Sequence, residues 1–464
     1  MGVIQAALWH GHYAGTDSQL TQINSPRAIN TMLCASILKL IMTEATRQQA
    51  LSLSSSTVAF AACFASWTLF SILGVEIRDQ LQLNYTQFAL LLVAPILTGA
   101  LSRLPSGILA GIYGGRRIMF FQMLIVGIAL LFYPLATTYT HYLLYGIVIG
   151  LAGGTFAAGI TFVSAWHPKA RQGTAMGIFG AGDAGAAITN LVAPMAIITF
   201  GSARVPLIYG AVMLVAAFTF LLMSSEDPAH RNQHKIDRPL NEELKPLGEL
   251  RVWRFGLYYF FVFGGFLALT LWLPQFYVEH YGLDLKTASF ATLLFTVPAA
   301  LVRALGGWFA DYFGARTINW MVFWVCLVCL FFLSYPPTTM TIHGIDRDLS
   351  LNIHTPVWLF TGLLFIMGVA MGFGKASVYR LIYDYYPDHM GAVGGAVGLI
   401  GALGGFVLLL LFGLANDLTG ISTSCFGLLY GVLAGCMILM HYAIKRGEFR
   451  ERLAQAQADE FLSL

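Results

Sequence analysis

Two arginines stand inside long apolar stretches of this chain, at the same place in two copies of one pattern. Arg103 is followed four positions later by Gly107, and Arg303 is followed by Gly307 in the same way. A guanidinium in hydrocarbon costs roughly 2.5–3.5 kcal/mol on insertion scales, so an arginine there usually serves a function. The pair predicts a duplicated membrane protein with a central anion site. The alternative is that each arginine pairs with a buried acid or a helix end.

The composition is that of a polytopic membrane protein. Apolar residues make up 57% of the chain and charged residues 11%, whereas soluble domains carry about 25% charged residues. We expect an all-α membrane protein of twelve transmembrane helices in two pseudosymmetric six-helix halves, because a ~30 Å core takes about 20 apolar residues per span. The predicted spans are 57–78, 86–112, 117–136, 141–166, 173–199, 204–223, 253–280, 286–313, 317–336, 356–384, 391–415 and 422–445.

The charged residues predict the domain organisation and the orientation. Lysines and arginines gather in the loops on one side and in the longest interruption, so both termini are expected in the cytoplasm and the chain in the inner (plasma) membrane. The predicted parts are an N-terminal segment 1–56, a first half 57–223, a linker 224–252, a second half 253–445 and a tail 446–464.

The N-terminal segment has two interpretations. Its apolar run at 29–42 is too short to span a membrane, and Met42 opens a stretch typical of a cytoplasmic start. Residues 1–41 are therefore expected either to lie upstream of the native start or to form a poorly ordered tail.

Other segments repeat as well. Gly177-Ile-Phe-Gly180-Ala-Gly182 in the fifth span is similar to Gly398-Leu-Ile-Gly401-Ala-Leu-Gly404 in the eleventh. Small residues allow close helix packing, and glycines also expose backbone to a small ligand. The loop after the first arginine carries Gly111 and Arg116, whereas the second copy carries Asp311 and Arg316. An acid beside an arginine at a helix end is expected to form a gate contact, so its loss in the first copy predicts a different latch.

These segments resemble two known signatures. The loops from Gly107 and from Gly307 resemble that of the major facilitator superfamily, with Gly111 as a departure from it. Residues 166–185 and 391–406 look like the two nitrate signatures of the nitrate/nitrite porter family. The resemblance covers about 57–445, and it implies alternating access of two halves around a midplane site.

The resemblance also assigns a binding site. It implies that Arg103 and Arg303 bind nitrate or nitrite oxygens, and the planar fork of guanidinium donors suits a flat anion. It implies an aromatic lining whose rings exclude bulkier anions such as sulfate. The residues of that lining are Phe156, Tyr259 and Phe263, and the glycines predicted at the same site are Gly180, Gly182, Gly401 and Gly404.

Four further residues are candidates for gating or proton coupling. Asp183 stands where many family members carry asparagine, and Lys375 is an unusual lysine in the tenth span. The two are expected to pair and close the inner gate, or Asp183 takes up a proton with the anion. The alternative is that Lys375 snorkels and Asp183 bonds locally. Asp311 and Arg116 complete this set.

The expected function is nitrate uptake by proton symport. The alternatives are a nitrate/nitrite antiporter or nitrite exporter, a porter for another small anion such as formate or cyanate, and a nitrate sensor that does not transport. Scattered histidines give no ligand or nucleophile spacing, so no enzyme activity, metal or cofactor is expected. Cys326 and Cys329 are expected to pack in a helix. The expected partners are nitrate, nitrite, protons and membrane lipid, with no nucleic acid, for a monomer.

Overall fold

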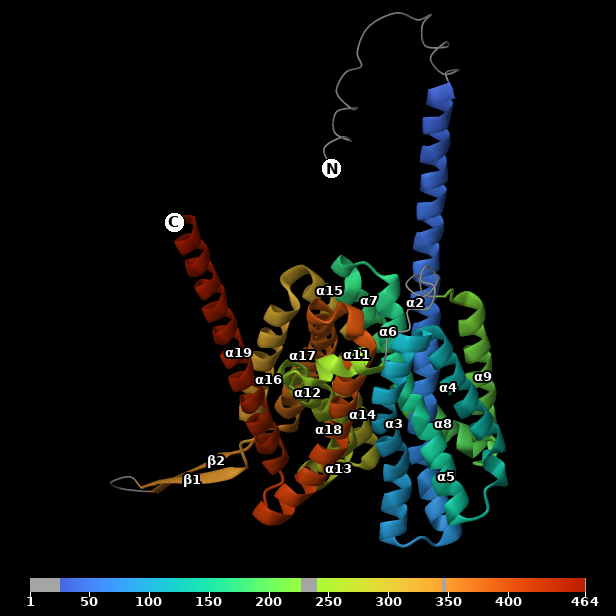
Figure 1. Cartoon of the computed structure of the whole chain (residues 1–464). Coiled ribbons are helices and arrows are strands. Elements are labelled where there is room, and N and C mark those ends of the chain that lie inside the picture. The colour runs from blue at the N-terminus through green and yellow to red at the C-terminus, as the bar shows by residue number, and fades with distance from the viewer. Residues whose placement is uncertain (1–25, 227–239, 344–347, 464) are drawn as a thin grey trace, which may run out of the picture. The chain divides into compact units, whose positions relative to one another are not determined.

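The computed structural model describes residues 26–226, 240–343 and 348–463, and it is built almost entirely from helices (Figure 1). Residues 1–50 form one unit and residues 51–464 form a second, compact unit. Helix α2 (Pro26–Leu81) includes residues 26–41, which the sequence suggested as a tail. Residues 1–25 of that segment lie outside the described residues.

Six spans precede the linker. After α2, their helices follow one another with short turns and several 3-10 segments. These elements are α3 (Tyr85–Tyr113), α4 (Gly115–Phe132), η2 (Tyr133–Leu135), α5 (Tyr139–Gly150), η3 (Leu151–Gly154), α6 (Thr155–Trp166), η4 (Lys169–Arg171), α7 (Gln172–Gly180), η5 (Ala181–Asp183), α8 (Ala184–Phe200) and α9 (Val205–Met223).

The remaining helices follow the same plan. The short helices α11 (Leu240–Leu244) and η6 (Lys245–Gly248) lead into the seventh span. The later elements are α12 (Leu250–Tyr259), the π-helix η7 (Phe260–Gly265), α13 (Phe266–Tyr281), α14 (Leu285–Leu301), α15 (Arg303–Phe313), α16 (Ala315–Leu333), β1 (Thr338–His343), β2 (Asp348–Ile353), α17 (Val357–Tyr385), η8 (Pro387–His389), α18 (Met390–Thr419) and α19 (Ser424–Ser463).

The spans agree with the hydropathy prediction. Among the described residues, eleven helices are long and apolar enough to cross a membrane. The bent pair Lys286–Leu301 and Arg303–Phe313, with an angle of 43° between its parts, makes the twelfth. Pro298 lies just before this bend, where it weakens the helix. The predicted fold class is therefore confirmed.

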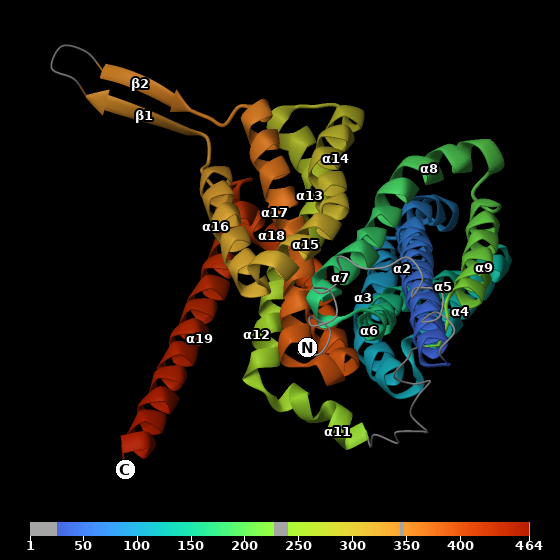
Figure 2. The same ribbon diagram turned by 90° about the horizontal axis from the view of Figure 1, so that it is seen from above.

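A β-hairpin between α16 and α17 is the exception to the helical plan, and the sequence analysis did not predict it. Its antiparallel strands pair Thr338 with Ile353 and Met340 with Leu351. The hairpin projects away from the helices in both views (Figures 1 and 2). It lies at the opposite end of the spans from the loops that carry Arg116, Lys169 and Arg316, and we call the latter end the basic end.

Glycines bring the two sets of spans into backbone contact near the basic end. A Cβ on Gly107 would collide with the carbonyl oxygen of Gly391, and a Cβ on Gly307 would collide with that of Gly173. Helices α7 and α15, which carry the second pair, lie side by side in both views (Figures 1 and 2). Such close approach needs small residues, so the described conformation is closed at the basic end.

The cysteines behave as packing residues. Cys326 and Cys329 are buried in α16, as the sequence analysis expected. All five cysteines whose side chains are described are free thiols. These observations agree with the interpretation of cysteine as a small apolar side chain.

Candidate anion site

Arg103 lies in the middle of α3 and is 1% exposed. Its Nη1 donates to the carbonyl of Gly398 over 3.1 Å. The guanidinium carbon lies 5.2 Å from the ring centroid of Phe156 and 4.8 Å from that of Phe263. Its Nε has no hydrogen-bond partner among the described residues. Leaving a buried donor without a partner costs free energy. This guanidinium therefore has an N–H group free to donate to a bound anion.

Arg303 is the first residue of α15, directly after the bend, and it is fully buried. A cation near a helix N-terminus is repelled by the helix dipole. The Asp183 carboxylate offsets this repulsion. Nη1 of Arg303 donates to Asp183 Oδ2 over 2.6 Å and to the Gly180 carbonyl over 3.2 Å. The suggested pairing of an arginine with a buried acid therefore holds for Arg303, and that acid lies in the same cluster.

Asp183 joins Arg303 to Lys375. Lys375 Nζ lies 3.3 Å from Asp183 Oδ2, and the Lys375 side chain is fully buried. The amine also lies 3.7 Å from the centre of the Phe266 ring, a cation–π contact. Lys375 does not snorkel to the surface, and Asp183 bonds to α15 and α17 rather than locally. The role of this pair in transport stays a prediction.

The three predicted aromatic residues lie with the two arginines. The rings of Phe156 and Tyr259 are nearly parallel, at 11°, with centroids 6.4 Å apart. The rings of Tyr259 and Phe263 stack at 5.1 Å. The guanidinium carbons of Arg103 and Arg303 each lie 5.2 Å from the Phe156 centroid. Two cations from different sets of spans thus share one aromatic ring.

Departures from regular α-helix place these residues. The 3-10 segment η3 ends at Gly154, two residues before Phe156, and η5 ends at Asp183. The π-helix η7 follows Tyr259 and contains Phe263. π-Segments occur often at functional sites because the extra residue re-aims the neighbouring side chains. Periodicity in the sequence gave no sign of these breaks.

Tyr379 belongs to the cluster, although the sequence analysis did not select it. It is fully buried, and its ring packs edge-on to Phe156 at 5.1 Å and to Tyr259 at 5.0 Å. Its hydroxyl donates to the Gly394 carbonyl over 2.9 Å. Tyr379 follows Lys375 by four residues, so both share one face of α17. That spacing was the available signal.

The four predicted glycines divide into two groups. A Cβ on Gly180 would collide with the Arg303 guanidinium, and one on Gly401 would collide with the Tyr259 ring. Gly182 instead packs against Phe60 of α2, and a Cβ on Gly404 would lie 2.8 Å from the Phe260 ring. The last two glycines therefore serve helix packing in this conformation.

The structural repeat has a different register from the one suggested by the sequence. Gly177 packs against the backbone of Arg303, as Gly395 packs against that of Arg103. The carbonyl that accepts from each arginine belongs to Gly180 in one copy and to Gly398 in the other. Gly180 thus corresponds to Gly398 rather than to Gly401, and Gly398 is a site residue that the sequence analysis missed.

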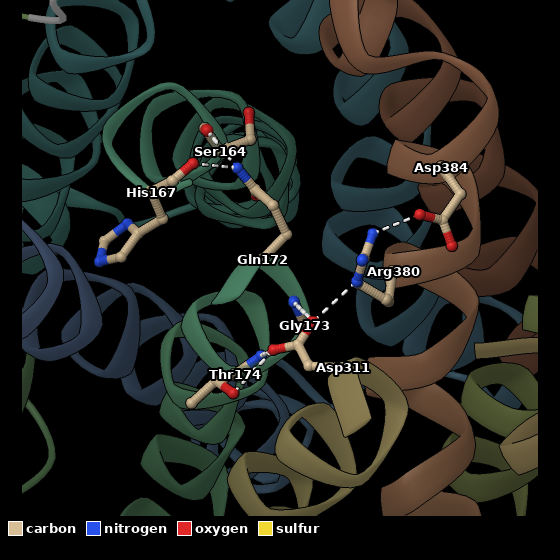
Figure 3. Close-up of polar contacts among 8 residues, drawn as sticks. All are labelled: Ser164, His167, Gln172, Gly173, Thr174, Asp311, Arg380 and Asp384. Carbon is tan, nitrogen blue, oxygen red and sulfur yellow. Dashed lines mark hydrogen bonds and ion pairs between the residues drawn. The ribbon is translucent and has the colours of Figure 1, made fainter. Parts of the chain in front are cut away.

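A second polar cluster closes the basic end (Figure 3). The carboxylate of Asp311 accepts from the backbone N–H groups of Gly173 and Thr174, over 2.8 and 2.7 Å. The Thr174 hydroxyl donates over 2.8 Å, and Arg380 Nε donates over 2.7 Å. Arg380 also bonds to Asp384. Asp311 thus joins α15 to the N-terminus of α7, where helix geometry favours an anion.

The arginines of the repeated loops have other partners. Arg116 donates to Ser224 Oγ over 3.0 Å and to the Leu221 carbonyl, so it binds the end of α9 within the first six spans. Arg316 donates to the Tyr385 hydroxyl. The arginine beside Asp311 is Arg380 rather than Arg316 of the same loop, and the gating role of Arg116 stays a prediction.

The corner before α7 is held by Gln172 (Figure 3). Its Nε2 donates to the carbonyls of Ser164 and His167 over 2.6 and 2.5 Å. Burial lowers the pKa of the His167 imidazole, and this effect exceeds the rise caused by its hydrogen bond to the Val163 carbonyl. The imidazole is therefore neutral at neutral pH, and it adds no charge beside the gate.

Replacing Asp311 with Asn should weaken the closed basic end. The amide keeps the shape but loses the charge that strengthens its hydrogen bonds. We expect a loss of about 1–2 kcal/mol in stability and a Tm lower by roughly 2–4 °C, measured by thermal unfolding in detergent. Asp384→Asn is the matched control, because Asp384 also bonds to Arg380 but its side chain is 33% exposed, so the change should lower the Tm less. Equal shifts for both variants would contradict this role of Asp311.

Comparison with known proteins places the chain among transporters. The family model of the Major Facilitator Superfamily matches residues 56–409. A crystal structure of the E. coli fucose:proton symporter FucP superposes with a TM-score of 0.67 at 15% identity, over 85% of this chain and 99% of that one. At that identity the likeness concerns the fold alone.

Curated relatives are closer in sequence. A Thermus thermophilus protein named "Probable nitrate/nitrite antiporter NarK1" is 38% identical over 404 residues, which cover 84% of this chain and 90% of the relative. The "Nitrite extrusion protein" of Bacillus subtilis is 28% identical, over 80% of this chain and 89% of its own.

Proposed function

Because the chain belongs to the nitrate/nitrite porter family of the major facilitator superfamily, we propose that it carries nitrate and nitrite across the plasma membrane by alternating access. The names of the relatives support this substrate class. The basic end is then cytoplasmic, because positive residues mark that side. In this proposal the predicted halves, residues 57–223 and 253–445, rock about a central site.

One observation carries the proposal. Arg103 and Arg303 come from different halves, yet both guanidiniums lie against the Phe156 ring and keep a buried Nε without a partner among the described residues. Two planar donors beside parallel rings suit a flat oxyanion with three acceptor oxygens. We infer that one nitrate bridges the two arginines and that the aromatic rings limit its thickness. A tetrahedral anion fits such a slot poorly.

We further propose that transport is coupled to protons through Asp183. The carboxylate already occupies Nη1 of Arg303, so nitrate must displace it or share the guanidinium with it. Protonation of Asp183 removes the competing negative charge and frees Arg303 for the substrate. Lys375 holds the same carboxylate oxygen, and it keeps Asp183 in place during this exchange. A proton and nitrate would then enter together.

Exchange of nitrate for nitrite is the second candidate, and the name of the Thermus relative favours it. In that mode Asp183 stays ionised and moves from Arg303 towards Lys375 as the anion binds. No titratable group is then required.

Uptake into proteoliposomes distinguishes the two modes. Nitrate uptake is measured with internal nitrite and no pH gradient, and then with an inwardly directed proton gradient and no internal anion. Proton coupling predicts that the gradient alone drives accumulation. Stimulation by internal nitrite alone would establish exchange instead. Competition by formate or cyanate equal to that by unlabelled nitrate would refute the substrate assignment.

Asp183→Asn tests the proton role directly. The amide cannot take up a proton, so uptake should no longer rise with an inward proton gradient, while downhill nitrate flux should remain. The change leaves Arg303 and Lys375 without their shared anion, and breaking a buried pair destabilises by about 3–5 kcal/mol. Added nitrate should therefore raise the Tm of this variant more than that of the unmodified protein. A pH response equal to that of the unmodified protein would remove Asp183 from the coupling mechanism.

A further inference from the structure

The repeat leaves one carboxylate position without a side chain. Asp311 follows Gly307 by four residues, and the matching residue after Gly107 is Gly111. We propose that Glu243, from the linker helix α11, supplies this missing carboxylate and forms a second gate contact at the basic end. The inference rests on the proposed transport function, because a gate acts only in a protein that opens and closes.

The Glu243 carboxylate lies where an acid at position 111 would lie. A Cβ added to Gly111 would be 2.8 Å from Oε1 of Glu243 and 3.3 Å from its Cδ. α11 is thus seated on the basic end of α3. Glu243 belongs to the linker and not to either repeated loop. The sequences of the two loops therefore do not show which residue replaces the missing acid at position 111.

Glu243 lies beside the same kind of glycine contact as Asp311, although it faces His389 at 3.5 Å where Asp311 accepts from backbone N–H groups. Gly307 packs against the carbonyl of Gly173 at the start of α7, and Gly107 packs in the same way against that of Gly391 at the start of α18. The start of α18 is therefore the counterpart of the helix end that Asp311 binds. A helix N-terminus attracts a carboxylate in either place.

The burial of Glu243 is unusual for a connecting segment. Its side chain is 2% exposed, and Oε2 lies 3.5 Å from Nδ1 of His389, the residue before α18. Its Oε1 is buried and has no hydrogen-bond partner among the described residues. The preceding Glu242 is exposed. A carboxylate is seldom buried without a role. Glu243 lies beside Gly111 of the first half and His389 of the second.

The contact gives the linker a mechanical part in transport. Glu243 lies between α3 of the first half and the start of α18 of the second. Opening of the basic end separates these helices, so Glu243 must leave one of them. The linker then holds the closed state on one side as Asp311 and Arg380 hold it on the other.

A rescue experiment tests this gate. In a cysteine-free background, spin labels at the exposed positions Lys169 and Leu250 report by pulsed EPR the ratio of closed to open basic ends in lipid nanodiscs. Glu243→Ala should lower that ratio about tenfold, the effect expected from the loss of a buried charged contact. Adding Gly111→Asp to Glu243→Ala should restore the ratio, because the acid then comes from α3, as Asp311 comes from α15. Glu242→Ala is the matched control and should leave the ratio unchanged.

The outcomes separate this inference from the proposed function. Label distances do not depend on nitrate flux, so they remain informative in a protein that carries another anion. A closed-to-open ratio in Glu243→Ala equal to that in Glu242→Ala would overturn the gate. So would a Glu243→Ala defect that Gly111→Asp leaves unrepaired, since Glu243 would then act through packing rather than through its charge.

Discussion

Arg103→Lys is expected to reduce nitrate uptake by roughly 100-fold at equal amounts of protein in proteoliposomes. The amine keeps the charge but loses the planar fork, so one charge-assisted hydrogen bond to the anion is lost, worth about 1.5–3 kcal/mol. Arg103 suits this test better than Arg303 does. It makes no ion pair with Asp183, so its replacement leaves no buried acid without a partner. The fold should therefore remain intact.

A binding measurement separates recognition from turnover. Nitrate should raise the Tm of the unmodified protein, because a ligand that binds only the folded state stabilises it, and it should not raise the Tm of Arg103→Lys. Arg316→Lys is the control, since Arg316 donates to Tyr385 at the basic end and should keep both uptake and the nitrate-induced shift. Uptake by Arg103→Lys within threefold of the unmodified protein would exclude the proposed arginine clamp.

The spans and the charged core residues were predictable because burial is costly. Apolar stretches of about 20 residues reveal membrane helices. Arginines within them indicate a functional site, because a charge at that depth is costly and is seldom kept without a function. The same argument anticipated that Asp183 and Lys375 meet, as they do at 3.3 Å. Each of these charged residues is recognised from its local surroundings, and the Asp183–Lys375 pairing adds only that buried opposite charges favour each other.

What the sequence analysis missed depends on contacts between distant segments. Arg380 rather than Arg316 joins Asp311, because α17 passes beside α15. The register that matches Gly177 with Gly395 follows from which backbone each glycine touches, whereas glycine-rich sequences align almost equally well when shifted by three residues. Glu243 belongs to a linker with no repeated partner. Such pairings are settled by three-dimensional packing.

The glycine contacts lead to the second large effect. Gly307→Ala should reduce transport by tenfold or more, because its Cβ would collide with the carbonyl oxygen of Gly173 and keep the basic end from closing. Overpacking of a tight contact costs about 1–3 kcal/mol, which is roughly a 5- to 150-fold change in the ratio of closed to open states. The label pair at Lys169 and Leu250 should report a larger distance.

Position within the fold decides whether a glycine matters, and the chain supplies its own control. A Cβ added to Gly362 meets no atom within 4 Å, so Gly362→Ala should transport at the normal rate although it makes the same chemical change in a span. Gly107→Ala, whose Cβ would collide with the Gly391 carbonyl, should behave like Gly307→Ala. If both variants of the contact glycines transported as well as Gly362→Ala, closure at the basic end could not be a step of the transport cycle. If only one of them did so, the two contacts would have unequal parts, and the repeat would be symmetric in structure but not in mechanism.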